Sequence, residues 1–301
     1  MPDPVLRIRD RTITVGGTLV MGVVNANPDS FSDAGRFATF DRQLAHAEHL
    51  ADSGADIVDI GGQSAITGRP EERDVDEAER VVPLVHALRA SRPDVLISVD
   101  SYKPVVVEQA LAAGAGIVND VSGLRDPRVA QLCADAGAAL VIMHTLRPPK
   151  VDLQDPDAYD DVVADVARFF ERTLARAQQL GVPREALIVD PGPDFTKTPY
   201  QTVDLLRRLD EFRRFGRPLL LALSRKDFLG AITGKAPRAR DAATIAAVAH
   251  VAAAGGSIVR VHDVAAAVDA VATVETLTGR RDIAVDHRLP DDIRHEPPAT
   301  D

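Results

Sequence analysis

Eight short apolar runs recur along the chain, and each is followed by a loop and then by a segment in which apolar residues repeat every three to four positions. This alternation is typical of βαβ units, in which parallel strands are buried on both faces and helices connect them. The sequence therefore predicts an α/β fold with eight parallel strands. The runs cover residues 19–24, 56–60, 95–99, 116–118, 139–143, 187–189, 219–223 and 257–261.

An open, doubly wound sheet and a closed barrel could both hold eight such strands. An open sheet that binds a dinucleotide carries a glycine-rich turn of the form GxGxxG after its first strand, and no such turn follows residues 19–24. We therefore predict a single (β/α)8 TIM barrel. The length of 301 residues does not require a second domain, because barrels commonly take up about 250 residues as one unit.

The segments outside the eight units have their own patterns. Residues 5–15 contain two short β-rich stretches around a polar turn, which predicts an N-terminal β-hairpin that covers the bottom of the barrel. Residues 282–301 are rich in proline and aspartate without an apolar period, which predicts a flexible tail. We therefore assign residues 1–281 to the barrel with its hairpin. Within it, Pro83 should kink its helix or remove one hydrogen bond.

The net charge and the cysteine content restrict the kinds of partner and the cellular compartment that the chain fits. The formal net charge of −10 argues against binding to a nucleic-acid backbone, which needs basic surface to displace counterions. Cys133 is the only cysteine, so an internal disulfide is impossible and a reducing compartment is expected. Arg7, Arg9 and Asp10 lie where a secretory signal would need apolar residues, and the apolar stretch 245–256 is too short to cross a bilayer. We expect a cytoplasmic protein without a membrane partner.

Polar residues gather where the predicted strands end, which is where a barrel carries its chemistry. Seven of the eight strand ends carry a side chain that can hydrogen-bond or ionise, and a purely structural barrel would not need this. Carboxylate and amide groups suit a flat heterocycle, whereas the cationic groups suit a phosphate. The sequence therefore predicts one pocket for a nitrogenous ring that bears a phosphoryl group. Its candidate residues are Asn25, Asp100, Asn119, Asp190, Ser224, Lys226, Arg260 and His262.

Each of these residues has an alternative, structural interpretation when taken alone. Asp100 or Asp190 could cap the helix that follows its strand, and Arg225 and Lys226 could form surface ion pairs. His144 is better explained as a buried core histidine. His262 is better explained by function, because it lies between two charged residues at a strand end. The functional prediction therefore depends on the whole set.

Seven ordered motifs resemble those of the dihydropteroate synthase family. The resemblance covers nearly the whole barrel, roughly residues 19–278, and the motifs occur in the family's order. They are MGVVNANPDSFSD at 21–33, ISVD at 97–100, NDVSG at 119–123, MH at 143–144, DPG at 190–192, SRK at 224–226 and RVHD at 260–263.

The resemblance implies a transferase that condenses p-aminobenzoate with 6-hydroxymethyl-7,8-dihydropterin pyrophosphate and releases pyrophosphate, in folate biosynthesis. It also implies Mg²⁺ as cofactor and a homodimer through the outer helices of the later barrel units. The resemblance assigns pterin binding to Asp100, Asn119, Asp190 and Lys226, and it assigns pyrophosphate binding to Asn25, Arg260 and His262, with Asn25 also binding the metal. It places Ser224 and Lys226 on the p-aminobenzoate side. The flexible substrate loops that it implies contain Asn27, Asp29, Ser30, Phe31, Ala65 and Ile66.

Two segments depart from the family's pattern. The family has Gly-Gly-Glu-Ser-Thr-Arg-Pro-Gly after the second strand, and this chain has GGQSAITG at 61–68, so Ala65 and Ile66 replace a threonine and an arginine. Arg69 could take over part of that role. After the sixth strand, Gly-Phe-Gly-Phe-Gly-Lys becomes GPDFTK at 192–197. There Asp194 places a carboxylate near an anion pocket, which is unfavourable unless it is paired.

Three hypotheses follow. The first is an active dihydropteroate synthase, which the intact strand-end residues favour. The second is a divergent paralogue that binds a pterin but lacks condensation activity or acts on another pterin, and Ala65 and Ile66 favour it. The third is a folate-dependent methyltransferase of the related barrel class, which would leave Arg260 and His262 without a phosphate to bind.

Overall fold

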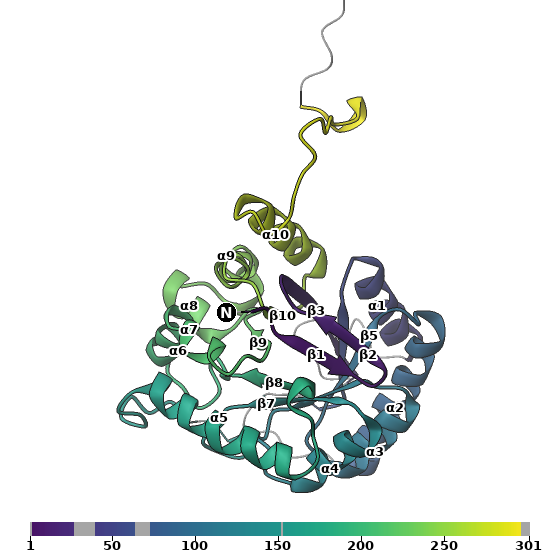
Figure 1. Ribbon diagram of the computed structural model, residues 1–301, viewed down its shortest axis with the longest axis vertical. Coiled ribbons are helices and arrows are strands. Elements are labelled where there is room, and N and C mark those ends of the chain that lie inside the picture. Colours follow the sequence, from purple (N-terminus) through teal and green to yellow (C-terminus); the bar gives the residue numbers. More distant parts are fainter. Residues whose placement is uncertain (1, 27–39, 64–72, 152, 296–301) are drawn as a thin grey trace, which may run out of the picture.

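A computed structural model describes residues 2–26, 40–63, 73–151 and 153–295 of the protein. Its centre is a closed barrel of eight parallel strands in the order β10-β3-β4-β5-β6-β7-β8-β9 (Figure 1). The predicted TIM barrel is therefore confirmed. The strands are β3 (Thr18–Asn25), β4 (Ile57–Gly61), β5 (Leu96–Asp100), β6 (Ile117–Asp120), β7 (Ala139–Met143), β8 (Leu187–Asp190), β9 (Leu219–Ala222) and β10 (Ser257–Val261).

Helices surround the barrel as a ring (Figure 1). The long helix α5 shows why they form, because its buried residues, such as Val166, Phe170 and Leu174, recur at the helical period and face the strands. Helix α2 runs through Pro83 without interruption, and this proline lies on the exposed side. The helices are α1 (Phe40–Asp52), α2 (Asp74–Ser91), α3 (Pro104–Ala113), α4 (Pro127–Ala136), α5 (Val162–Gln179), α6 (Pro199–Arg207), α7 (Asp210–Arg213), α8 (Asp227–Thr233), α9 (Asp241–Ala252) and α10 (Val264–Leu277).

Four of the eight strands extend to the polar residues that the sequence placed just beyond them. Asn25, Asp100, Asp120 and Asp190 are the last residues of β3, β5, β6 and β8. Strand residues alternate between the barrel interior and the helices, so a side chain at a strand's last position has a fixed direction. The strand geometry, rather than a loop, therefore positions Asn25, Asp100 and Asp190.

The predicted N-terminal hairpin is also confirmed. Strands β1 (Val5–Ile8) and β2 (Arg11–Thr14) pair antiparallel, with Leu6 opposite Ile13, and they cross one end of the barrel (Figure 1). Leu6 and Ile8 belong to the same apolar cluster as residues from all eight barrel strands, among them Met21. The hairpin therefore closes the barrel at the end opposite the carboxyl ends of the strands.

Leu6→Ala should destabilise the protein by about 2–5 kcal/mol, because Leu6 is fully buried and its truncation leaves a cavity. Urea denaturation measures this as a lower midpoint with an unchanged slope. Ile283→Ala is the matched control, since Ile283 is 64% exposed and should change stability little. A loss below about 1 kcal/mol for Leu6→Ala would show that the hairpin is not a stability element.

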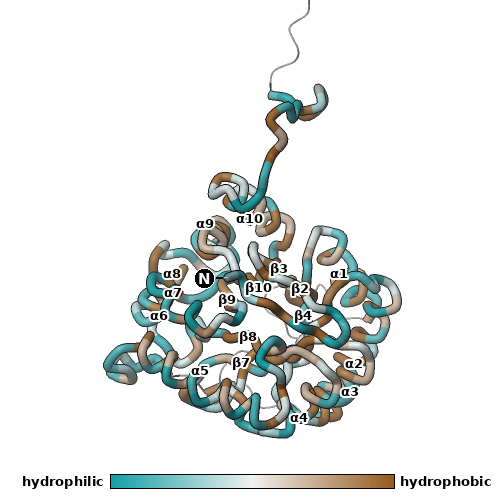
Figure 2. The backbone as a smooth tube through the Cα atoms, in the orientation of Figure 1, coloured by the Kyte–Doolittle hydropathy of each residue, from teal (hydrophilic) through white to brown (hydrophobic). Residues whose placement is uncertain are grey.

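Apolar residues concentrate in the strands and on the inner sides of the helices (Figure 2). Within the described ranges, no helix combines the length and apolar character needed to span a membrane. Beyond α10 the chain projects away from the barrel (Figure 1) and contains a short 3-10 helix at Asp291–Ile293. The assignment of residues 282–301 as a flexible tail stays a prediction.

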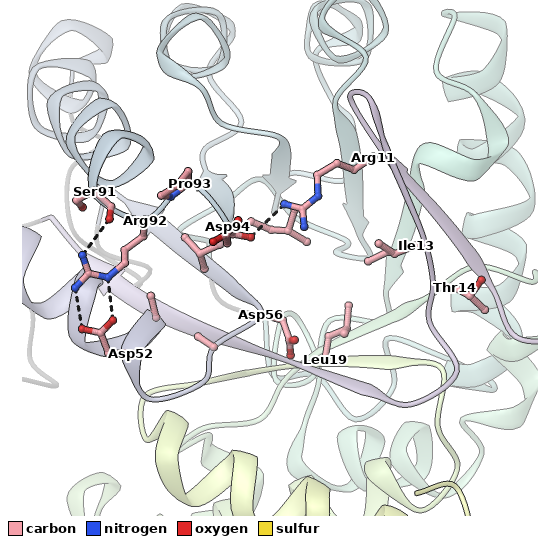
Figure 3. Close-up of a pocket in the computed structure, with 14 residues that line it drawn as sticks. Arg11, Ile13, Thr14, Leu19, Asp52, Asp56, Ser91, Arg92, Pro93 and Asp94 are labelled. Atoms are coloured by element: carbon pink, nitrogen blue, oxygen red, sulfur yellow. Dashed lines mark hydrogen bonds and ion pairs between the residues drawn. The ribbon is translucent and has the colours of Figure 1, made fainter.

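A surface cavity of about 580 Å³ lies beside the hairpin, among β2, the ends of α1 and α2, and the starts of β3 and β5 (Figure 3). Four of its charged side chains already have partners: Arg92 donates to both carboxylate oxygens of Asp52, Arg11 donates to the backbone carbonyl of Asp94, and Asp56 accepts from the amide of Val20. The strand ends with the candidate residues lie at the other end of the barrel, so this cavity is not their pocket.

Candidate active site

Buried and half-buried polar side chains from four strands meet at the carboxyl end of the barrel. Arg260 of β10 donates from Nε to Asp59 Oδ2 at 2.7 Å and from Nη2 to Asp100 Oδ2 at 2.8 Å. Asn119 of β6 donates to the same Asp59 oxygen at 3.1 Å. These contacts bring three of the predicted residues, Asp100, Asn119 and Arg260, into one network.

Asp59, which is not among the residues predicted from the sequence, is the centre of this network. It lies within the apolar run 56–60, and its side chain is fully buried. A charged residue two positions after Ile57 in a barrel strand shares the inward direction of Ile57. A buried charge of this kind requires a partner, so the strand period could have identified Asp59 as a site residue.

The network leaves two acceptors for a ligand. Asp59 Oδ1 and Asn119 Oδ1 are buried and have no hydrogen-bond partner among the described residues. Because buried polar atoms in native proteins are almost always paired, these two oxygens are candidates to accept from N–H donors of a bound ring.

Burial raises the pKa of the site carboxyls. The pKa of Asp100 rises to about 7 because burial outweighs the attraction of Arg260. The pKa of Asp190 rises to about 6 by burial, against hydrogen bonding from Gly192 and attraction to Lys226. Neither residue caps a helix, because Asp100 pairs with Arg260 and Asp190 accepts from the Gly192 amide at 2.7 Å. Perturbed carboxyls in one pocket are typical of functional sites.

Lys226 lies at the N-terminus of α8 and reaches towards the loop after β8. Its Nζ donates to the carbonyl of Pro193 at 3.0 Å and lies 4.0 Å from the centre of the Phe195 ring. Burial lowers the pKa of Lys226, while Asp194 and Asp190 oppose that shift. Its neighbour Arg225 pairs with Asp241 at 2.9 Å, so the ion-pair interpretation applies to Arg225 and not to Lys226.

His144 is a buried histidine in the core, as the structural interpretation predicted. Its side chain is 2% exposed and packs edge-on against Phe169. The ammonium of Lys197, which is fully buried, lies 2.9 Å from His144 Nδ1 and donates to the carbonyls of Gly192 and Phe195. Burial lowers the pKa of His144 well below its usual range and lowers the pKa of Lys197 to about 7.

Lys197 should make the protein more stable as the pH rises from about 7 to 10. In that interval the unfolded lysine, with its pKa near 10.5, is protonated, whereas the folded lysine, with its pKa of about 7, is largely neutral. Unfolding then takes up a proton, so raising the pH favours the folded state, by at most about 1.4 kcal/mol per pH unit. Urea denaturation between pH 7 and 10 measures this slope. Lys197→Met should remove it, and an unchanged slope in that variant would contradict the assignment.

The remaining predicted residues lie at the ends of β3, β9 and β10. His262 follows β10, and its Nδ1 lies 2.9 Å from Ser224 Oγ. Burial, followed by repulsion from Arg225 and Arg260, lowers the pKa of His262 to about 4, so the imidazole is neutral at pH 7. Asn25 ends β3 and is partly buried. The structure thus places Ser224 and His262 in contact at the strand ends.

The two substrate loops of the sequence analysis lie outside the described residues. This applies to Asn27, Asp29, Ser30 and Phe31 after β3, and to Ala65, Ile66 and Arg69 after β4. Their predicted roles stay predictions.

Comparison with known proteins identifies the family. The profile of the family described as pterin binding enzyme matches residues 21–262. The dihydropteroate synthase of Escherichia coli strain K12 is 39% identical over 256 residues, which are 85% of this chain and 90% of that protein. The Yersinia pestis dihydropteroate synthase, solved with a sulfonamide drug, superposes with a TM-score of 0.86 at 36% identity, over 91% of this chain and 99% of that one.

A third relative has a substrate-sized ligand bound. The Xanthomonas albilineans dihydropteroate synthase with 4-aminobenzoic acid superposes with a TM-score of 0.83 at 39% identity, and the match covers 91% of this chain and 98% of that one. With a barrel that is closed in the same way and a profile match that spans it, the chain belongs to the pterin-binding enzyme family and, within it, to the dihydropteroate synthases.

Proposed function

We propose that the protein condenses p-aminobenzoate with 6-hydroxymethyl-7,8-dihydropterin pyrophosphate and releases pyrophosphate, as a transferase of folate biosynthesis. The observation that carries this proposal is the strand-end network of Asp59, Asp100, Asn119 and Arg260 in a chain of the dihydropteroate synthase family. It combines acceptors for a flat nitrogen heterocycle with a cation for phosphate. The ligand in the Xanthomonas structure, 4-aminobenzoic acid, supports the second substrate.

For the pterin we assign Asp100, Asn119, Asp190 and Lys226. The guanidine-like edge of a pterin presents several N–H donors, which a carboxylate such as Asp190 can accept in pairs. Asp190 is 2% exposed, so water competes little for its oxygens and its hydrogen bonds to a ligand are strong. The unpartnered oxygens of Asp59 and Asn119 add acceptors next to Asp100.

For the pyrophosphate we assign Asn25, Arg260 and His262. A guanidinium carries five N–H donors, and Asp59 and Asp100 engage Arg260 through Nε and Nη2. Other donors of Arg260 can therefore bind phosphate oxygens, while the carboxylates fix the direction of the guanidinium. The departing pyrophosphate gains negative charge, so a fixed cation stabilises the transition state more than the ground state.

We also propose that Asn25 is a ligand of Mg²⁺. The amide oxygen of this residue is a hard ligand of the kind that Mg²⁺ prefers, and Mg²⁺ usually completes its shell with substrate phosphates and water. Among the described residues, no three His, Cys, Asp or Glu side chains gather as a metal site. The donor set therefore fits an ion that is held largely by the pyrophosphate and that neutralises its charge.

The p-aminobenzoate side lies at Ser224 and Lys226. Ser224 contacts His262, and Lys226 lies over Phe195, so a cation, a hydroxyl and an aromatic face are available to an aromatic carboxylate. The aniline nitrogen is a good nucleophile once it is placed beside the reacting carbon, so the site needs to supply position more than base catalysis.

The second candidate function, a pterin-binding paralogue without condensation activity, is favoured by Ala65 and Ile66 in the second loop. Calorimetry with the pterin pyrophosphate and Mg²⁺, run beside an assay of pyrophosphate release with p-aminobenzoate, separates the two. Turnover supports the synthase. Tight pterin binding without pyrophosphate release supports the paralogue, and absence of binding refutes the proposed pterin site.

If turnover is slow, Ile66→Arg should raise the rate of pyrophosphate release, and Ile232→Arg is the control on an exposed helix position.

We also propose a cytoplasmic homodimer that forms through α9 and α10. These helices are rich in alanine, and Ala242, Ala246 and Ala265 face solvent. Small apolar side chains allow two helices to approach closely. Light scattering of the purified protein at micromolar concentration should give twice the chain mass, and Ala246→Arg should lower it to the monomer mass.

A further inference from the structure

Two loops of the site contain non-glycine residues in left-handed backbone conformations. Asp194 and Thr196 in the loop after β8 have φ angles of 63° and 52°, and Arg225 in the loop after β9 has a φ angle of 59°. Such conformations are unfavourable for side chains with a Cβ, most of all for a β-branched threonine. They persist only where the surroundings hold them, so the contacts of these loops must stabilise these conformations.

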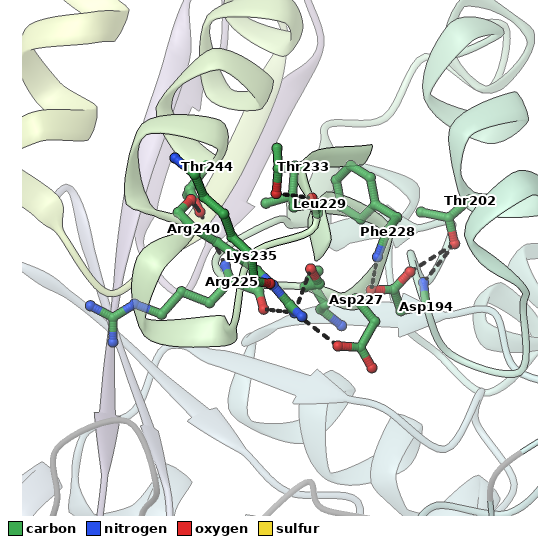
Figure 4. A network of polar contacts seen from close by, with 11 residues as sticks. Asp194, Thr202, Arg225, Asp227, Phe228, Leu229, Thr233, Lys235, Arg240 and Thr244 are labelled. Atoms are coloured by element: carbon green, nitrogen blue, oxygen red, sulfur yellow. Dashed lines mark hydrogen bonds and ion pairs between the residues drawn. The ribbon is translucent and has the colours of Figure 1, made fainter. Parts of the chain in front are cut away.

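Asp194 connects the two loops through its carboxylate (Figure 4). Its Oδ1 accepts from the hydroxyl of Thr202 at 3.1 Å, and its Oδ2 accepts from the amide of Phe228 at 3.2 Å. The amide of Asp194 donates back to the Thr202 hydroxyl at 3.0 Å. Thr202 is fully buried on α6 and Phe228 lies in the first turn of α8. The carboxylate expected to be unfavourable is therefore paired, and it ties α6 to the start of α8.

Arg240 holds the same segment from the other side (Figure 4). Its Nη1 donates to the carbonyls of Arg225 and Lys226 at 2.9 and 3.0 Å and to Asp227 Oδ1 at 2.8 Å. The backbone around Lys226 is thus held at two points: Arg240 donates to the Lys226 carbonyl, and the Phe228 amide donates to Asp194. Its ammonium returns to the Asp194 loop, where it donates to Pro193 and lies over Phe195.

We propose that Asp194 is a positioning residue for the p-aminobenzoate side of the site: by holding the first turn of α8 against α6, it fixes the direction of the Lys226 ammonium over Phe195. The expected effect on KM for p-aminobenzoate rests on the proposed function. Both carboxylate oxygens of Asp194 accept hydrogen bonds within the protein, one from the Thr202 hydroxyl and one from the Phe228 amide. Its effect therefore passes through Lys226.

The test compares Asp194→Gly, Asp194→Asn and Thr196→Gly. Glycine adopts the left-handed conformation without strain and removes the carboxylate together with its Cβ, whereas asparagine tolerates that conformation and keeps one acceptor for the Phe228 amide. Thr196→Gly is the matched control, because it removes a side chain from the other left-handed position of the same loop and leaves the Asp194 carboxylate in place.

Asp194→Gly should raise KM for p-aminobenzoate about tenfold, which corresponds to one lost hydrogen bond to a charged group, and should leave the affinity for the pterin pyrophosphate within twofold. Asp194→Asn should recover most of the loss, and Thr196→Gly should show neither change. An Asp194→Gly enzyme with wild-type KM, or one whose only defect is a lower melting temperature, would overturn the inference.

A second measurement does not depend on turnover. Labelling of Lys226 by an amine-reactive reagent, followed by mass spectrometry of its peptide, should be several-fold faster in Asp194→Gly than in the wild type and in Thr196→Gly. If the wild type shows no turnover while this difference appears, the proposed function fails and the positioning role stands. Equal labelling rates in all variants would refute the positioning role whatever the activity.

Discussion

Asp190→Asn should lower kcat/KM for the pterin pyrophosphate by about 100- to 1,000-fold. Asparagine has nearly the shape of aspartate but carries no charge, and its amide nitrogen cannot accept a hydrogen bond. Two charge-assisted hydrogen bonds to the pterin would be weakened or lost, and each is worth about 1.5–3 kcal/mol. Because Asp190 is 2% exposed, water cannot replace them.

Steady-state kinetics at saturating p-aminobenzoate measure this loss, and Asp210→Asn is the control on an exposed surface position. The wild type should also lose affinity for the pterin below pH 6, because the pKa of Asp190 is about 6 by burial and its protonated form accepts fewer hydrogen bonds. An Asp190→Asn enzyme within fivefold of the wild type would remove Asp190 from the pterin site.

Arg260→Met should reduce both stability and activity. The substitution leaves Asp59, which is fully buried, and Asp100 without their shared cation. Removing one partner of a buried ion pair costs about 3–5 kcal/mol, because the other charge stays desolvated. Urea denaturation at pH 7.5 measures the loss of stability, and pyrophosphate release should fall below detection because the phosphate-binding cation is gone.

The pH dependence of this variant provides an internal check. Protonated carboxyls need no cation, so the stability difference between Arg260→Met and the wild type should shrink as the pH falls through the raised pKa of Asp100, about 7 in the wild type and higher without Arg260. Arg92→Met is the control, because Arg92 pairs with Asp52 in solvent and such pairs contribute about 1 kcal/mol or less. If the stability difference between Arg260→Met and the wild type were the same at pH 5 and pH 8, the electrostatic explanation would be contradicted.

The sequence predicted the barrel, its eight strands and the hairpin because burial on both faces imposes a recognisable apolar run at each strand. It predicted less well which polar residues contact each other. Asp59 was missed because it interrupts an apolar run, although its position relative to Ile57 determines its inward direction. The strand period predicts direction, whereas a partner such as Arg260 lies about 200 residues away along the chain and reaches Asp59 only because barrel closure places β10 next to β3.

The departures from the family pattern also show that the sequence does not reveal contacts between residues far apart along the chain. Asp194 replaces a glycine, and the sequence alone indicated an unfavourable charge near an anion site. In the fold, Thr202 and the amide of Phe228 pair with it, eight and 34 residues away along the chain. His144 follows a strand end in the same way, but it is buried and lies in contact with the buried Lys197.

The synthase function is tested most directly by measuring the formation of dihydropteroate by the purified protein. The enzyme would be incubated with the pterin pyrophosphate, Mg²⁺ and p-aminobenzoate, and the product quantified by mass spectrometry, with Asp190→Asn as the inactive reference. We expect dihydropteroate and pyrophosphate to accumulate in equal amounts, at a rate that falls at least 100-fold in the variant. Tight binding of the pterin pyrophosphate without any dihydropteroate would contradict the synthase function and leave a pterin-binding protein.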